Sequence, residues 1–324
     1  MIDPAGRAAD FFTALCRLCL CALPLGFAVP RASAADNSEP APLAANALLL
    51  DVVNTGSKIV AVGDHGVVVV STDQGKTWRQ SPTPTRVLLT AVCFVGEQNG
   101  WAVGHDGVIL ATSDGGQTWI RQDDGQNPDT VLLDVRFLDE KVGFAVGAYG
   151  RFLSTSDGGR IWTAGKPSSD EVHFNRLSLG PTGDLYLAGE SGTLLVSTNR
   201  GKDWRKVEVP YDGSLFGAFP LTEGALLVYG LRGHIFRSDD QGASWAPVAN
   251  EVKVLISSGL RLKRGPVVLA GQAGNFFVSR DAGQNFSNWK PADFSTSVAA
   301  VVEAADGAIV TVGEAGAVRV NLPP

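Results

Sequence analysis

The sequence predicts an all-β protein, a seven-bladed β-propeller of four-stranded antiparallel blades. Two repeated markers that keep step along the chain predict it. An octapeptide of the form Ser/Thr-x-Asp/Asn-x-Gly-x-x-Trp/Phe occurs six times, and a pair of glycines three residues apart occurs seven times. The aromatic residues that close successive octapeptides, at 78, 119, 162, 204, 245 and 286, are 41 to 43 residues apart. A period near 40 residues with four strands per unit is typical of propeller blades.

The octapeptide is explained by the chemistry of a turn. Its third residue can accept N–H groups of its own turn, and the glycine two residues later supplies a positive φ. The closing aromatic ring buries apolar surface between neighbouring blades. We therefore assign a structural role to Asp73, Asp114, Asp157, Asn199, Asp240 and Asp281, and to Trp78, Trp119, Trp162, Trp204, Trp245 and Phe286.

Each glycine pair follows an apolar strand. The pairs are Gly63/Gly66, Gly104/Gly107, Gly147/Gly150, Gly189/Gly192, Gly230/Gly233, Gly271/Gly274 and Gly313/Gly316. In the third unit, residues 132–137 alternate as an inner strand and residues 142–148 form the second, which turns into residues 151–154. Such short strands between Gly and Asp turns match hairpin chemistry.

The seventh unit has no octapeptide, so we expect it to lack an outer strand. An unpaired strand edge invites aggregation and is usually covered. We therefore expect residues near 42–45 to pair beside residues 316–320 as a closing strand.

The N-terminus has the pattern of a signal peptide. Arg7 and Arg17 precede an apolar stretch at residues 18–29, and Ala32-Ser33-Ala34 supplies small residues for cleavage. The apolar stretch is too short to span a bilayer. We expect a signal peptide at 1–34, an N-terminal segment at 35–47 and the propeller at 48–324. This division implies an exported protein without membrane insertion after cleavage, in the periplasm or, in a photosynthetic organism, the thylakoid lumen.

Charge and cysteine content narrow the possible partners. The formal net charge is −6, and removal of residues 1–34 makes it about −7 at unperturbed pKa values. A general nucleic-acid binder needs a basic field, so that class is excluded. Cys93 would be the one cysteine left after cleavage, in an apolar run where it is expected to pack as a small hydrophobe. No motif for a cofactor is present, and we expect none.

The octapeptides resemble the Asp-boxes, or bacterial neuraminidase repeats, of sialidases and other propellers. Combined with the glycine pairs, as in residues 102–107 followed by 112–119, the pattern resembles the photosystem II stability/assembly factor family, which has homologues in non-photosynthetic bacteria. The resemblance covers residues 48–321. It implies a monomeric, non-enzymatic chaperone or scaffold that holds a membrane-protein complex or envelope protein, with an arginine-rich binding surface.

Three arginines are candidates for that surface. Arg136 and Arg261 are expected at matching places of units three and six, and Arg176 lies two residues earlier in unit four. Units one, two and seven carry apolar residues there: Val53, Cys93 and Val302. The alternative is that these arginines pair with local carboxylates such as Asp134 and Asp139.

A second set of polar residues lies in the glycine-pair turns. Asp64-His65 and His105-Asp106 belong to neighbouring units, and Glu314 follows in unit seven. Two imidazoles and several carboxylates on adjacent turns could hold a divalent metal. The alternative is that turn residues are polar for solubility.

An enzyme is the remaining class. Sialidase chemistry requires three arginines, a tyrosine nucleophile with a glutamate partner and an acidic residue. None of the four tyrosines, Tyr149, Tyr186, Tyr211 and Tyr229, lies in such a constellation. We therefore predict a binding protein, an assembly factor or an accessory subunit of an envelope transporter, over a glycosidase-type enzyme.

Overall fold

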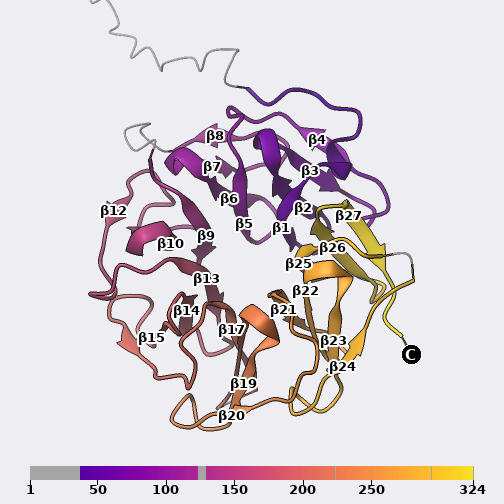
Figure 1. Cartoon of the computed structure of the whole chain (residues 1–324). Helices are drawn as coiled ribbons and strands as arrows, with labels where there is room; N and C mark the ends of the chain where they lie inside the picture. The colour runs from indigo at the N-terminus through magenta and orange to yellow at the C-terminus, as the bar shows by residue number, and fades with distance from the viewer. Residues whose placement is uncertain (1–36, 123–128, 223, 293, 324) are drawn as a thin grey trace, which may run out of the picture. The chain divides into compact units, whose positions relative to one another are not determined.

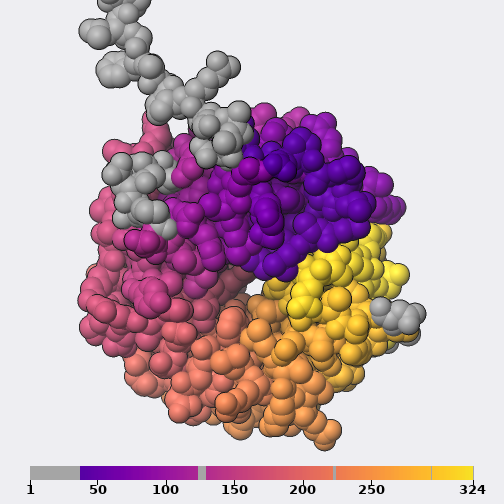
Figure 2. All heavy atoms as spheres, turned by 45° about the horizontal axis from the view of Figure 1, so that its top comes forward, coloured from indigo at the N-terminus to yellow at the C-terminus, as the bar shows by residue number. Residues whose placement is uncertain are grey.

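Seven small antiparallel sheets surround a common axis in the computed structural model of the chain (Figure 1). The structure describes residues 37–122, 129–222, 224–292 and 294–323. Sequence order follows the ring, so that each repeat unit is one blade. Figure 2 shows the ring hollowed at its centre. The predicted seven-bladed propeller is confirmed.

The strands of each blade run outward from the axis in sequence order. The first strands are β1 (Leu49–Asn54), β5 (Leu89–Val95), β9 (Leu132–Phe137), β13 (Phe174–Leu179), β17 (Leu215–Thr222), β21 (Ile256–Arg261) and β25 (Val298–Glu303). The second strands are β2 (Ile59–Gly63), β6 (Asn99–Gly104), β10 (Gly143–Gly147), β14 (Leu185–Gly189), β18 (Ala225–Gly230), β22 (Val267–Gly271) and β26 (Ile309–Gly313).

The third strands are β3 (Val68–Ser71), β7 (Ile109–Thr112), β11 (Phe152–Thr155), β15 (Leu194–Ser197), β19 (Ile235–Ser238), β23 (Phe276–Ser279) and β27 (Gly316–Val320). The fourth strands are shorter: β4 (Arg79–Ser81), β8 (Ile120–Arg121), β12 (Thr163–Ala164), β16 (Arg205–Lys206), β20 (Ala246–Pro247) and β24 (Ser287–Trp289). Short 3₁₀ turns are η2 (Ala44–Asn46), η3 (Asp64–Gly66), η4 (His105–Gly107), η5 (Ala148–Gly150), η6 (Leu231–Gly233) and η7 (Gln272–Gly274).

The two repeated turns lie on opposite faces of the ring. In blade one, Gly63 at the glycine-pair turn pairs with Leu49, the first residue of β1. At the other end of the same sheet, Ser71 at the start of the octapeptide pairs with Ile59. We call these faces the glycine-pair face and the Asp-box face.

The core lies between blades. Seven buried apolar clusters each combine side chains from two neighbouring blades, one cluster for each junction of the ring. Strands β2, β10 and β26 are buried along their whole length, because both of their faces pack against other blades. Cys93 is 2% exposed within one of these clusters, where it packs as a small apolar side chain.

The octapeptide turns are held by hydrogen bonds to their aspartates. Oδ1 of Asp73 accepts the N–H groups of Lys76 and Thr77, at 3.1 and 2.8 Å, and Oδ2 accepts the Thr77 hydroxyl at 2.6 Å. The hydroxyl and N–H of Thr77 hold the pKa of Asp73 below its usual range. The closing tryptophans pack edge-on against phenylalanines of the preceding blade, as Trp162 does against Phe137. The indole N–H of Trp119 bonds to Gly116 at 3.1 Å, whereas those of Trp162, Trp204 and Trp245 are buried without a partner in the described part of the chain.

The ring closes differently from our expectation. Blade seven has three strands, and residues 44–46 form the turn η2 rather than a strand paired with β27. The segment is nevertheless adjacent, because a Cβ atom on Gly316 would lie 2.1 Å from the carbonyl oxygen of Ala45. Gly66 meets the Thr85 carbonyl in the same way, and both carbonyls lie four residues before the next first strand. Residues 45–48 therefore act as an ordinary link between blades seven and one.

Candidate functional site

The three arginines predicted to form one surface are placed in different environments. Arg136 lies opposite Phe144, whereas Arg261 lies opposite Val267, one step further along the strand. The expected match between them is therefore wrong, because the pairing register, which the sequence spacing does not reveal, sets the position. Arg176 lies opposite Ala188, nearer the glycine-pair face.

Arg176 is bound to two carboxylates at the ring centre. Its Nη2 lies 3.1 Å from Oδ1 of Asp51 and its Nε lies 3.7 Å from Oδ2 of Asp134, and these carboxylates are 2% and 1% exposed. Burial opposes the arginine charge, but Asp51 and Asp134 outweigh it and raise the pKa of Arg176. Asp51 also accepts the N–H of Val92 at 3.0 Å. This cluster joins blades one, two, three and four.

The other two arginines have no carboxylate partner in the described residues. The Nε atom of Arg136 is buried without a hydrogen bond. Arg261 is exposed, and its Nη1 donates to the carbonyl of Leu221 in blade five. The alternative of local pairing holds for Arg176 with Asp134, whereas Asp139 pairs with Arg200.

The predicted metal ligands are not brought together. Nδ1 of His65 lies 2.9 Å from Oδ2 of Asp64 in its own turn, and the His65 side chain is 80% exposed. Among residues 37–122, 129–222, 224–292 and 294–323, no group of three or more His, Cys, Asp or Glu could hold a metal ion. Asp64, His65, His105 and Asp106 therefore remain separate pairs on two turns, because each turn points its own side chains outward.

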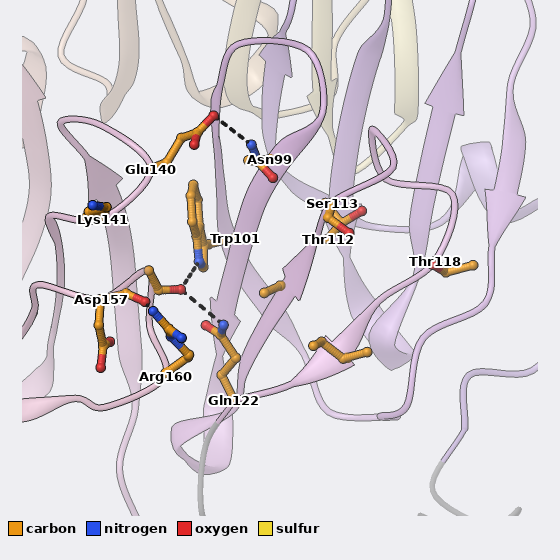
Figure 3. Close-up of a pocket in the computed structure, with 13 residues that line it drawn as sticks. Asn99, Trp101, Thr112, Ser113, Thr118, Gln122, Glu140, Lys141, Asp157 and Arg160 are labelled. Carbon is orange, nitrogen blue, oxygen red and sulfur yellow. Dashed lines mark hydrogen bonds between the residues drawn. The ribbon is translucent and has the colours of Figure 1, made fainter.

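A polar hollow of about 380 Å³ lies at the junction of blades two and three on the Asp-box face (Figure 3). At its base the indole N–H of Trp101 and Nε2 of Gln122 donate to the carbonyl of Gly158, at 3.0 and 3.1 Å. Trp101 stacks on Phe137 with ring centroids 3.5 Å apart. Lys141 and Arg160 stand at the rim on the blade-three side (Figure 3). We call this space the first hollow.

A second hollow of about 540 Å³ lies at the next junction, between blades three and four. Asp157 of the blade-three Asp-box lines both hollows, and Ile161, Arg200 and Lys202 line the second. The two hollows therefore flank one Asp-box turn. Sequence reasoning did not single out these residues, although the apolar Ile161 at a position that is polar in the other five octapeptides is visible in the sequence.

A comparison with protein families identifies the chain. The model of the family described as "Photosynthesis system II assembly factor YCF48" matches residues 36–111 and 124–322. The chain belongs to this family. The resemblance drawn from the octapeptides and glycine pairs is thereby confirmed. Among curated proteins, no sequence matches the chain.

Solved structures of YCF48 proteins share the fold. A structure described as YCF48 bound to D1 peptide is 20% identical, with a TM-score of 0.70 over 86% of this chain and 94% of that one. YCF48 from Cyanidioschyzon merolae is 16% identical, with a TM-score of 0.66 over 87% and 97% of the two chains. A streptogramin B lyase, at 12% identity and a TM-score of 0.72 over 86% and 94%, shows that the fold also occurs in an enzyme. At such identities the likeness establishes the fold alone, and function must be argued from the site.

Proposed function

We propose that this protein is a non-enzymatic assembly or stability factor that docks on a membrane-protein complex and holds a peptide segment of one subunit. One observation carries the proposal. The family model of an assembly factor matches residues 36–111 and 124–322, and a propeller of that family has been solved with a peptide bound. A rigid ring with two wide faces suits this role, because preorganised interfaces change little on binding.

The environments of the tyrosines support a binding role over glycoside hydrolysis. Tyr229 is 4% exposed, and burial raises its pKa to about 12. Burial also raises the pKa of Tyr186 and of Tyr211. A nucleophile requires the opposite, a lowered pKa or an adjacent base. The one hydrogen bond of a tyrosine hydroxyl in the described residues is donated by Tyr211 to the Leu231 carbonyl.

The contact surface that we propose is the basic tip between β21 and β22, which contains Arg261, Lys263 and Arg264. All three side chains are exposed. The Arg261 side chain bonds to Leu221 of blade five, and the N–H of Lys263 bonds to Oε2 of Glu303 in blade seven at 2.8 Å. These contacts hold the tip across three blades. Of the three predicted arginines, Arg261 thus stays in the proposed surface.

We propose that the protein acts after export, in the periplasm or in a thylakoid lumen. The predicted signal peptide, residues 1–34, lies outside the described residues. In the part of the chain that the structure describes, no helix is long and apolar enough to cross a membrane. Mass spectrometry of the protein recovered from its host tests export, because cleavage predicts an N-terminus at Ala35.

The function is tested by affinity capture from detergent-solubilised membranes of the host. Wild-type protein is compared with the charge-reversed tip Arg261→Glu/Lys263→Glu/Arg264→Glu and, as a matched surface control, with Lys76→Glu. We expect one membrane protein to be enriched by wild type and by the control, and at least tenfold less by the tip variant. Equal capture by all three would reject the tip. Stoichiometric retention in a mature complex would indicate an accessory subunit, and no capture together with glycoside hydrolysis would indicate an enzyme.

A further inference from the structure

The Asp-box of blade three differs from the other five octapeptides. Their seventh residues are polar, namely Thr77, Thr118, Asp203, Ser244 and Asn285, whereas blade three carries Ile161. The hydroxyls of Thr118 and Ser244 bond to Oδ2 of their aspartates at 2.6 Å. Oδ2 of Asp157 has no such donor among the described residues, and Ile161 is 67% exposed. Blade three therefore presents an apolar side chain beside an open carboxylate oxygen.

The first hollow contains a second acceptor without a partner. Gln122 donates through Nε2 to the Gly158 carbonyl, which leaves Oε1 facing the hollow, buried and without a hydrogen bond in the described residues. A buried amide oxygen that bonds to nothing is costly, and a ligand N–H would satisfy it. The free acceptors on both sides of the blade-three turn thus require donors from a ligand.

The cations around the two hollows are available as well. Lys141 and Arg160 at the first hollow and Lys202 at the second form no ion pair with a described residue. Arg160 uses Nε to bond to the Asp157 carbonyl at 3.0 Å, which holds its guanidinium beside the turn. The carboxylate of Glu140 accepts from Asn99 at 3.0 Å. The rim therefore offers positive charge in a protein that is negative overall.

We propose that the Asp-box face of blades two to four is a binding site for an extended acidic peptide segment of a partner protein. Its backbone N–H groups meet Gln122 and Asp157. Its carboxylates pair with Lys141 and Arg160 at one end and with Lys202 at the other. An aliphatic side chain between them covers Ile161. Free acceptors together with free cations fit a peptide, since a peptide carries both N–H donors and carboxylates, whereas a nucleic-acid backbone carries phosphates without donors.

The next junction of the ring supports this assignment by contrast. The hollow between blades four and five measures about 110 Å³, and its described lining contains Asp184 and Gln241 but no basic residue. The cationic rims are thus a property of the junctions beside blade three. The proposal does not depend on the proposed function, because purified protein can bind a peptide whether or not a membrane complex is its partner.

Phage display of random dodecapeptides on the purified protein without residues 1–34 tests the site. Selected peptides should carry two or more Asp or Glu residues flanking an aliphatic residue. Synthetic versions should bind about tenfold more weakly to Arg160→Glu and to Lys141→Glu, measured by fluorescence anisotropy. Lys76→Glu is the matched control, because Lys76 holds the same octapeptide position as Arg160 beside a complete Asp-box, and it should bind like wild type.

Ile161→Thr separates binding from folding. The new hydroxyl can bond to Asp157 as in blades one and two, so the variant should unfold at a temperature equal to or above that of wild type while losing at least tenfold in peptide affinity. Selected peptides without acidic residues, or with equal affinity for wild type and all variants, would overturn the proposal. So would selective binding of phosphatidylglycerol vesicles or of single-stranded DNA through Arg160 and Lys141 in place of peptides.

Discussion

Arg176 on β13 binds Asp51 on β1, with Nη2 3.1 Å from Oδ1, although the two residues are 125 positions apart in the chain. The contact crosses the ring centre from blade four to blade one. The same aspartate accepts the N–H of Val92, and Asp134 accepts that of Leu177 at 2.6 Å, so each carboxylate also ties its blade to the next one. Arg176 supplies the positive charge that lets two buried carboxylates lie in one place.

Replacing Arg176 with Met should destabilise the ring. Removal of one partner from a buried ion pair typically costs about 3–5 kcal/mol, because the remaining charges are left uncompensated. Urea unfolding followed by circular dichroism measures the change. Adding Asp51→Asn and Asp134→Asn should recover most of the loss, since an amide still accepts the backbone N–H groups. The exposed Arg264→Met is the control, and a loss below about 1 kcal/mol in Arg176→Met would show that the cluster is dispensable.

The repeats explain how much of this architecture was predictable. Blade number, strand order and turn positions follow from local chemistry that recurs every 41 to 43 residues, as in Gly63 and Asp73. The Arg176–Asp51 contact does not follow, because it depends on ring closure and on the pairing register. The mismatch between Arg136 and Arg261 has the same origin, since one step along a strand changes a residue's neighbours.

The candidate site was only partly readable. Ile161 stands out in the sequence as an apolar residue in a polar turn position, and this signal predicts an open carboxylate at Asp157. The hollows beside it exist because adjacent blades splay apart at the Asp-box face, which no single repeat encodes. The closing segment was placed correctly beside β27 but not as a strand, because the link before a first strand adopts the turn η2 instead.

Gly316 should be more sensitive to substitution than a glycine of similar backbone conformation. Its φ is +72°, and a Cβ atom would meet the Ala45 carbonyl at 2.1 Å. Gly307 has a φ of +85°, and a Cβ atom there would have no other atom within 4 Å, so Gly307→Ala carries only the cost of a left-handed residue, about 1–2 kcal/mol. Gly316→Ala should cost about 1–3 kcal/mol more, because the link must move. Equal unfolding midpoints would show that this link does not constrain closure.

Cys93 should be inert in the folded protein. Burial raises its pKa to about 12, so roughly one thiol in ten thousand is ionised at pH 8 even when solvent reaches it. Ellman's reagent should therefore react at least a thousandfold more slowly with native protein than with protein in 8 M urea. Cys93→Ser gives the blank rate. A fast reaction with native protein would mean that the junction of blades two and three opens readily.

The Asp-boxes should govern stability in acid. The hydroxyl and N–H of Ser244 hold the pKa of Asp240 at about 2, below the value near 3.9 of an unfolded chain. A carboxylate with a depressed folded pKa contributes stability above the unfolded pKa, and this contribution is lost as pH falls through the folded value. The window is therefore about pH 4 to 2, in which the urea midpoint should fall as the boxes are protonated. Asp240→Asn should lower the midpoint at pH 7 and flatten its fall below pH 4. Ile161→Thr should do the reverse, because a hydroxyl on Oδ2 lowers the pKa of Asp157 further. Parallel acid profiles for wild type and both variants would place the acid sensitivity outside the Asp-boxes.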